Sequence, residues 1–342
     1  MRAAVWRGED RVDVCEIPTP VIGEEEALIR VRAAGICATD YHIISGKLKI
    51  GKFPNVQGHE ICGEVAEINT RRTDITVGQR CVIATSMGCG HCDYCREGKE
   101  YICNESQEIG YFPNNGGYAE YVKVPVSAIV PISETVSDKA GAILESAVCP
   151  TESLMRIGVP VAGSVVVAGT GPAGLVFIMM SRLLGADKII VLVRDEKSEI
   201  RAMRYGATHV VNVKTSKDPV AEVAKITGGK RADLVIEATG AKPMIEQMPY
   251  YVKKGGDIIL YGMPADGEQV CLPITKLVVE EITVHGTVGN TKAWYPLVKL
   301  IESGKLDLEQ MVTHEFALDE INEAFDLFRN HDKTLIKAII KF

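Results

Sequence analysis

The sequence contains no long hydrophobic run. Its longest apolar stretches, such as Leu175–Met180, are far shorter than the roughly 20 residues that span a bilayer. The first ten residues, Met1–Asp10, contain no apolar signal core, which favours an uncleaved cytoplasmic protein. We therefore expect neither secretion nor membrane insertion, and no membrane partner.

Basic runs are also absent. The chain has 38 Lys and Arg against 45 Asp and Glu, a net charge of −7, and both signs are scattered along its length. A nucleic acid or an anionic membrane surface is usually bound by a basic stripe, so neither is expected as the main partner. Internal repeats and low-complexity segments are absent as well.

The composition is that of a two-domain globular protein. The 342 residues are 46% apolar and 24% charged, enough for two domains with sizeable cores. Alternating apolar and polar residues in the first part of the chain predict a mostly antiparallel β region. The strands expected there are Ala27–Arg32, Gly63–Ile68 and Tyr118–Val124.

Beyond Ser137 the pattern changes, because helical segments alternate with short, fully apolar strands. This alternation indicates βαβ units around a buried parallel sheet. The expected strands are Ser164–Ala168, Lys188–Val193, Asp233–Ala238 and Asp257–Tyr261. After Gly286 we expect two helical stretches and a closing strand, at Tyr295–Ser303, Leu318–His331 and Lys337–Ile340, and periodicity alone assigns this tail to neither domain.

Cysteine is unevenly distributed. A random 15-residue window of this chain would hold about 0.4 Cys, yet Cys89, Cys92, Cys95 and Cys103 fall in one such window with the spacing C-x2-C-x2-C-x7-C. In a reducing compartment this cluster indicates a metal site rather than disulfides. Four thiolates around Zn²⁺ leave no open position, so we expect a structural zinc. An iron–sulfur cluster and buried unliganded thiols are the alternatives.

A glycine-rich loop follows one of the apolar strands. Gly169-Thr170-Gly171-Pro172-Ala173-Gly174 separates Val165–Ala168 from a helical segment, which is the context that makes GxGxxG a dinucleotide-binding motif. Gly169 would permit the tight turn, Gly171 the approach of the pyrophosphate, and Gly174 close packing of the helix on the strand. A flexible surface loop is the alternative.

Cys37, His59 and Glu145 are three further candidates, each of which has an ordinary structural explanation. An isolated Cys37 is more often a packing residue, His59 could be a partly buried histidine with a polar partner, and Glu145 could be an acid at a helix N-terminus. Each is weak evidence for a metal site when taken alone.

Taken together, these motifs resemble the zinc-dependent medium-chain dehydrogenase/reductase family over the whole chain. Cys37-x-Thr39-Asp40, Gly58-His59-Glu60-x2-Gly63, the four-cysteine lobe and the glycine loop occur in the family's order. The chain looks most like the sorbitol and threonine dehydrogenase branch, because Glu145 stands where alcohol dehydrogenases have a second cysteine. The fold implied is α/β, with a GroES-like β-rich catalytic domain (1–146 and 289–342, including the zinc lobe 88–104) and a Rossmann doubly wound parallel-sheet domain (147–288). The active site would lie between the two.

The resemblance implies a second, catalytic zinc ion. Cys37, His59 and Glu145 would surround it with Glu60 beside it, and which of the two carboxylates ligates directly is left open. One thiolate, one carboxylate and one neutral imidazole leave the ion near zero net charge and able to act as a Lewis acid. Asp40 would orient His59.

The resemblance also implies the reaction and the cofactor. The reaction is the reversible oxidation of a secondary alcohol, with hydride transfer to the nicotinamide. Thr39 would take the proton, which would pass through the ribose to His42. The cofactor residues implied are Gly169, Thr170, Gly171, Pro172, Ala173, Gly174, Val193, Arg194, Ser198, Gly262 and Thr287. Because Val193-Arg194 stands where NAD enzymes place an acid, we favour NADP over NAD, although Asp195 is close by.

Several alternatives stay open at this point. Polyols, sugars or cyclitols are the first substrate candidates, and a threonine-like amino alcohol is the second. In place of the Arg and aromatic residue that hold sorbitol hydroxyls in sorbitol dehydrogenases, this chain has Gly289-Asn290. A non-enzymatic zinc- and nucleotide-binding regulator and a zinc-free quinone or enoyl reductase are the rivals to the enzyme. By resemblance we expect a homodimer or homotetramer.

Overall fold

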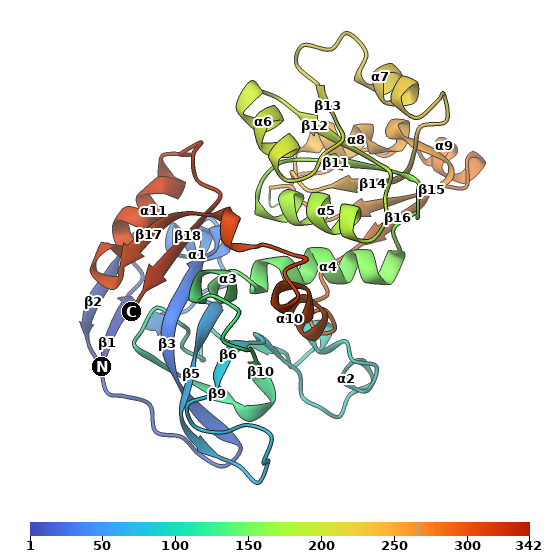
Figure 1. Cartoon of the computed structure of the whole chain (residues 1–342). Coiled ribbons are helices and arrows are strands. Elements are labelled where there is room, and N and C mark those ends of the chain that lie inside the picture. The colour runs from blue at the N-terminus through green and yellow to red at the C-terminus, as the bar shows by residue number, and fades with distance from the viewer. Residues whose placement is uncertain (266) are drawn as a thin grey trace. The chain divides into compact units, whose positions relative to one another are not determined.

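The computed structural model describes residues 1–265 and 267–342. The chain divides into two compact units, Met1–Val148 with Asn290–Phe342, and Cys149–Gly289 (Figure 1). Within the described residues, no helix combines the length and the apolar character that crossing a membrane requires.

A seven-stranded sheet forms the centre of the first unit. Its order is β10-β6-β5-β3-β18-β17, and β9 also pairs with β3. All pairs are antiparallel except β17 with β18. The strands are β3 (Glu26–Ile36), β5 (Glu60–Asn69), β6 (Arg80–Ile83), β9 (Tyr121–Pro125), β10 (Ile129–Pro131), β17 (Val312–Ala317) and β18 (Lys337–Lys341).

Pairing of β18 with β3 joins the two ends of the chain. Ala338 lies opposite Ile36, and Ile340 lies opposite Ala34. All four residues are buried in one apolar core with the inward-facing residues of β5 and β9. The C-terminal tail therefore belongs to the first unit, and it brings Lys337 next to the end of β3.

Smaller elements complete this unit. They are the sheet of β1 (Arg2–Trp6), β2 (Val12–Glu16) and β4 (Asn55–Val56), the pair β7 (Ser86–Met87) and β8 (Gln107–Glu108), the helices α1 (Ala38–Ile44), α2 (Asp93–Arg96), α3 (Asp138–Ala142), α10 (Trp294–Glu302) and α11 (Ile321–Arg329), and the 3₁₀ turns η1 (Glu100–Ile102), η2 (Val126–Ala128), η3 (Glu309–Met311) and η4 (Leu318–Glu320). Helix α4 (Glu145–Ile157) begins in this unit and continues into the second.

Several predicted elements of this unit have other bounds in the structure. β3 and β5 extend beyond the predicted Ala27–Arg32 and Gly63–Ile68, and two further differences have local causes. The strand expected from Tyr118 begins only at Tyr121, because the backbone of residues 118–120 bonds mainly to β1, where the Ala4 amide donates to the Tyr118 carbonyl and the Glu120 amide donates to the Arg2 carbonyl. The helix expected at 318–331 is divided into η4 and α11, and the Glu320 side chain caps the start of the turn at the Ala317 amide.

The second unit contains a six-stranded parallel sheet in the order β13-β12-β11-β14-β15-β16. This is a doubly wound order, the type of sheet that the family resemblance implies, with its reversal beside β11. The strands are β11 (Ser164–Ala168), β12 (Lys188–Val193), β13 (His209–Asn212), β14 (Ala232–Glu237), β15 (Val252–Leu260) and β16 (Thr283–Gly286), and the helices are α5 (Pro172–Leu183), α6 (Glu196–Arg204), α7 (Pro219–Ile226), α8 (Lys242–Tyr251) and α9 (Ile274–Val279).

Both faces of this sheet are covered, which explains why its strands are apolar without alternation. Val166 and Ala168 of β11 pack in a core with residues of α7 and α8, including Val223 and Met248. Their neighbours Val165 and Val167 point to the opposite face and are equally buried. Ligands of such sheets bind at the carboxyl ends of the strands next to the reversal.

Candidate active site

Three potential zinc ligands converge in the first unit. Cys37 lies between β3 and α1, whereas Glu60 begins the neighbouring strand β5 and His59 directly precedes it. One ligand atom from each of these three residues lies within 4.8 Å of the other two. A thiolate, an imidazole and a carboxylate are the donor types that catalytic zinc sites use, so the residues present fit the metal.

Asp40 holds the His59 ring in place. His59 Nδ1 lies 3.1 Å from Asp40 Oδ1, and the Tyr118 hydroxyl donates to Asp40 Oδ2 over 2.6 Å. Burial disfavours the protonated ring, but the charge of Asp40 outweighs it and raises the pKa of His59 well above its usual value. Asp40 therefore makes the imidazole a more basic metal ligand. It also leaves Nε2 as the ring nitrogen that can bind a metal.

The Glu60 carboxylate has a second partner, Lys337. Both side chains are buried, and Lys337 Nζ lies 2.5 Å from the carboxylate oxygens of Glu60. The ammonium also donates to the Ile36 carbonyl over 3.2 Å. Gly35 leaves space for this pair, because a Cβ there would overlap Glu60 Oε2.

Glu145 stands at the start of α4 and is not among the three converging residues. Its carboxylate has no hydrogen-bond or ion-pair partner among the described residues. Burial and the charge of Glu60 raise the pKa of Glu145 to about 7, against the opposing charges of His59 and Lys337. Glu145 is therefore close enough to His59 and Glu60 for their charges to act on its carboxylate.

Thr39 and His42 lie on α1, three residues apart, and such residues share a helix face. Thr39 Oγ1 is 3.5 Å from Cys37 Sγ, and the His42 side chain is exposed. Partial burial and the charge of Lys47 lower the pKa of His42. The ring is thus neutral, and able to accept a proton, at a lower pH than an ordinary histidine.

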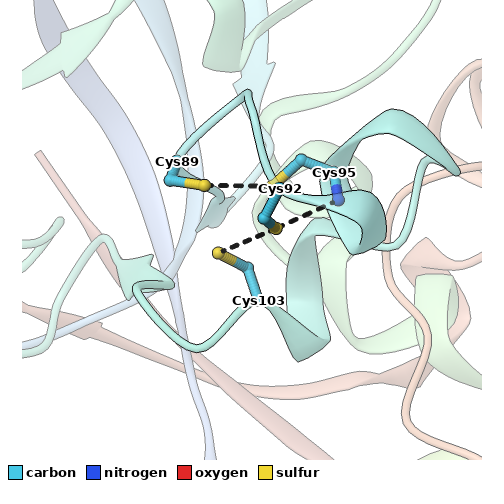
Figure 2. A group of neighbouring side chains, drawn as sticks. All are labelled: Cys89, Cys92, Cys95 and Cys103. Carbon is cyan, nitrogen blue, oxygen red and sulfur yellow. Dashed lines mark hydrogen bonds between the residues drawn. The ribbon is translucent and has the colours of Figure 1, made fainter.

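The four clustered cysteines point toward a common centre (Figure 2). Cys89 Sγ and Cys95 Sγ are 3.9 Å apart, and Cys92 Sγ and Cys103 Sγ are 3.7 Å apart. Zn–S bonds of about 2.3 Å in a tetrahedron place sulfurs about 3.8 Å from one another. Backbone amides of His91 and Cys92 lower the pKa of Cys89 to about 6, which favours the thiolate that binds metal.

The glycine loop lies between β11 and α5. Gly169 has a φ of 108°, and a Cβ at Gly174 would overlap the Gly169 carbonyl, so the helix packs directly on the turn. A Cβ at Gly171 would meet nothing within 4 Å. Gly171 is the N-cap of α5 and Pro172 opens the helix, so the free amides at this end can receive a phosphate.

A cavity of about 610 Å³ adjoins the loop. Of the predicted cofactor residues, Gly169, Thr170, Val193, Arg194 and Ser198 line it, whereas Gly171, Pro172, Ala173, Gly174, Gly262 and Thr287 do not. The lining also includes Asp195, Lys214 and Thr239. The volume suits a bound nucleotide.

The charges at the mouth of this cavity are unequal. Asp195 is the N-cap of α6, and its carboxylate accepts from the Ser198 amide over 2.9 Å. Arg194 and Lys214 are exposed, and no acid among the described residues forms an ion pair with either. Two free cations and one engaged carboxylate therefore face the cavity.

Glu237 fixes the opposite wall of the cavity. The carboxylate is fully buried at the end of β14 and accepts hydrogen bonds from the Thr239 amide over 2.8 Å, the Thr239 hydroxyl and the Gly240 amide over 3.1 Å. Gly262 packs on Gly240 so closely that a Cβ would overlap its nitrogen. Thr287 follows β16, and its hydroxyl is buried with no partner among the described residues.

Comparison with known proteins agrees with this architecture. Residues 23–134 match the model of the alcohol dehydrogenase GroES-like domain, and residues 172–303 match that of the zinc-binding dehydrogenases. The L-threonine 3-dehydrogenase of Bacillus licheniformis is 32% identical over 340 residues, 96% of each chain. The sorbitol dehydrogenase of Bacillus subtilis is 25% identical, covering 99% of this chain and 97% of its own. The crystal structure of a zinc-binding dehydrogenase from Sinorhizobium meliloti 1021 bound to NADP has a TM-score of 0.92 at 27% identity, covering 100% and 99%.

The chain belongs to the zinc-dependent medium-chain dehydrogenase/reductase family. It is an enzyme of the zinc-dependent alcohol dehydrogenase type, and the cofactors predicted from the sequence, zinc and a nicotinamide dinucleotide, are those of this family. The GroES-like and Rossmann folds that the resemblance implies are confirmed.

Sequence reasoning missed several residues around these sites. Lys337 could have been found from the sequence. A lysine is rarely buried unless it is paired, so a lysine at the start of the apolar strand Lys337–Ile340 predicts a polar partner. No sequence pattern indicates Tyr111, although its ring stacks on the His59 ring with centroids 5.4 Å apart. Lys214 and Thr239 reach the cavity only because neighbouring parallel strands end at one edge.

Proposed function

We propose that this enzyme oxidises the secondary hydroxyl of a polyol, sugar or cyclitol to a ketone, and reduces the ketone in reverse, with NADP as cofactor. The observation that carries the proposal is the approach of the Cys37 thiol and the His59 imidazole to within 4.8 Å of each other, with the Glu60 and Glu145 carboxylates beside them. The similarity of this protein to the sorbitol dehydrogenase of Bacillus subtilis supports the substrate class.

Cys37 and His59 would hold the catalytic zinc together with a carboxylate, and the bound ion would supply Lewis acidity at the alcohol oxygen. Glu60 is the carboxylate that lies within 4.8 Å of Cys37 and His59, but Glu145 is our choice for the ligand. Lys337 already neutralises Glu60 at 2.5 Å, whereas Glu145 lacks such a partner. Asp40 orients the His59 ring, and Cys89, Cys92, Cys95 and Cys103 would bind the structural zinc.

Thr39 and His42 would remove the proton that leaves the alcohol. The Thr39 hydroxyl, 3.5 Å from Cys37 Sγ, is close enough to the ligand set to accept a hydrogen bond from the substrate oxygen and pass a proton on. His42 is exposed on the same helix face and neutral near pH 7, so it would deliver the proton to water.

NADP is the cofactor that the cavity charges favour. Arg194 and Lys214 are free to pair with a 2′-phosphate, and these two cations outnumber Asp195, the one carboxylate in the lining, which also caps α6 through the Ser198 amide. Besides these, Gly169, Thr170 and Ser198 line the cavity, and Gly171 would face the pyrophosphate.

A threonine-like amino alcohol is the second candidate substrate. The observation that favours it is the 32% identity with an L-threonine 3-dehydrogenase over 96% of both chains. We further infer a cytoplasmic homodimer or homotetramer. All ten cysteines are free, which suits a reducing compartment.

The experiment is a substrate panel measured with zinc-loaded protein and both cofactors. Polyols, cyclitols, simple secondary alcohols and L-threonine are compared by kcat/KM with NAD and with NADP. We expect the highest value for a polyhydroxy substrate with NADP, and at least about a tenfold loss of the NADP value alone in Arg194→Ala. A higher kcat/KM with NAD that Arg194→Ala leaves unchanged would contradict the cofactor choice. No turnover of any alcohol by protein containing two zinc ions would contradict the activity.

A further inference from the structure

Three polar side chains, linked by hydrogen bonds, lie beside the metal-binding residues. The proposed chemistry uses none of these three. Asn290 Nδ2 donates to Ser86 Oγ over 2.8 Å, and the Ser86 hydroxyl donates to Glu108 Oε1. Ser86 and Glu108 face each other across the pair of strands β7 and β8. Asn290 comes from a distant part of the sequence, 204 residues from Ser86.

The segment that carries Glu108 packs directly on His59. Gly110 touches the Gly58 and His59 backbone, so closely that a Cβ there would lie 2.9 Å from the Gly58 carbonyl. The Tyr111 ring stacks on the His59 ring, and its hydroxyl lies 3.4 Å from His59 Nδ1. The charge of Glu108 interacts with those of His59 and Glu145. Glu108 is two residues from Gly110 and three from Tyr111, so these contacts place its segment beside His59.

Some acceptor atoms of these three side chains have no hydrogen-bond donor among the described residues. Ser86 has one proton and gives it to Glu108, while its oxygen accepts from Asn290. Asn290 is 9% exposed, and its Oδ1 is buried with no partner among the described residues. The Glu108 carboxylate, which the Thr85 hydroxyl also approaches, has lone pairs to spare. No cation forms an ion pair with Glu108 among the described residues.

We propose that Glu108, Ser86 and Asn290 form a subsite for a hydrogen-bond donor on the substrate, a hydroxyl or ammonium group on the carbon next to the reacting one. The inference rests on the proposed function and narrows its substrate class to vicinal diols and amino alcohols. A buried acceptor that stays unpaired costs binding energy, so an alcohol without the second donor is discriminated against.

Three compounds of one carbon skeleton test the subsite. Butane-2,3-diol carries a neighbouring hydroxyl, 3-aminobutan-2-ol a neighbouring ammonium group, and butan-2-ol neither. We expect the zinc-loaded wild-type enzyme to prefer one of the first two over butan-2-ol by about tenfold or more in kcat/KM, the usual effect of a hydrogen bond to a charged group. The compound that is preferred shows whether the subsite binds a hydroxyl or an ammonium group.

Two substitutions and one control tie that preference to the subsite. Glu108→Leu removes the acceptor, and we expect the ratio of kcat/KM between the preferred compound and butan-2-ol to fall to about one. Glu108→Gln keeps the shape and one acceptor oxygen but removes the carboxylate charge. We therefore expect kcat/KM to fall less for the diol than for the amino alcohol. Glu67→Gln, an exposed carboxylate on β5, is the control and should leave all three values unchanged. Ligand-observed NMR titration in the presence of cofactor supplies the ratio of Kd values independently of turnover.

Two results would overturn the inference. One is a wild-type enzyme that turns over all three compounds equally well. The other is a preference that survives in both Glu108 variants, each checked for an unchanged circular dichroism spectrum and zinc content. Failure of the proposed function is a different result, namely no turnover of any compound in the panel by the wild-type enzyme.

Discussion

Lys337→Met is the substitution whose effect follows most directly from the structure. The lysine is buried, its side chain 4% exposed against 0% for Glu60, and its Nζ lies 2.5 Å from the Glu60 carboxylate. Methionine keeps the length and apolar stem of the lysine but leaves Glu60 with an uncompensated charge. Removing one partner of a buried ion pair costs about 3–5 kcal/mol.

The assay is urea unfolding of the zinc-loaded protein, followed by tryptophan fluorescence. Both tryptophans, Trp6 and Trp294, lie in the first unit, which also contains the ion pair. We expect the free energy of unfolding to fall by about 3–5 kcal/mol in Lys337→Met and to recover in large part in the double variant with Glu60→Gln, which removes the unpaired charge.

Lys341→Met is the matched control. Lys341 is on the same strand, but its partner Glu315 is 3.2 Å away at the surface, with side-chain exposures of 58% and 34%. Such a pair contributes about 0–1 kcal/mol. If Lys337→Met costs no more than Lys341→Met, the buried pair does not hold Glu60 as described.

Three further predictions concern the other parts of the two units. Glu237→Gln leaves at least one of the amides that Glu237 now binds without an acceptor, so we expect a several-fold higher Kd for NADP by fluorescence titration. Cys103→Ser should lower the zinc content from two ions to one and lower the Tm, and a zinc content that stays at two would refute the four-thiolate site. Lys47→Met removes a charge that lowers the pKa of His42, so the acid limb of the pH profile of alcohol oxidation should move to higher pH; an unmoved limb would remove His42 from the proton path.

Two strands of the nucleotide-binding unit could be predicted to the residue because their signals are local, whereas β13 was not predicted and β15 begins five residues before the predicted Asp257. Ser164–Ala168 and Lys188–Val193 are strands with the predicted bounds, since each is a continuous apolar run in a sheet covered on both faces. The strand predicted at Asp233–Ala238 is shifted by one residue, to Ala232–Glu237. The Ala238 amide still bonds to β11, but the chain turns there toward Thr239, where the buried Glu237 carboxylate holds it.

The polar surroundings of the candidate metal site could not be predicted, because they are made by contacts between distant parts of the sequence. Glu60 and Lys337 are 277 residues apart, and Ser86 and Asn290 are 204 residues apart. Periodicity describes which face of a strand is buried, but not which strand lies next to it. Only the pairing of β18 with β3 brings Lys337 to Glu60.

Counting zinc ions in purified protein tests the central claim most directly. Elemental analysis of the wild-type chain should give two ions per chain, and Cys37→Ser should give one, with the fold intact and alcohol oxidation abolished. A wild-type chain that binds a single ion even after zinc supplementation, with the same content in Cys37→Ser, would contradict the account.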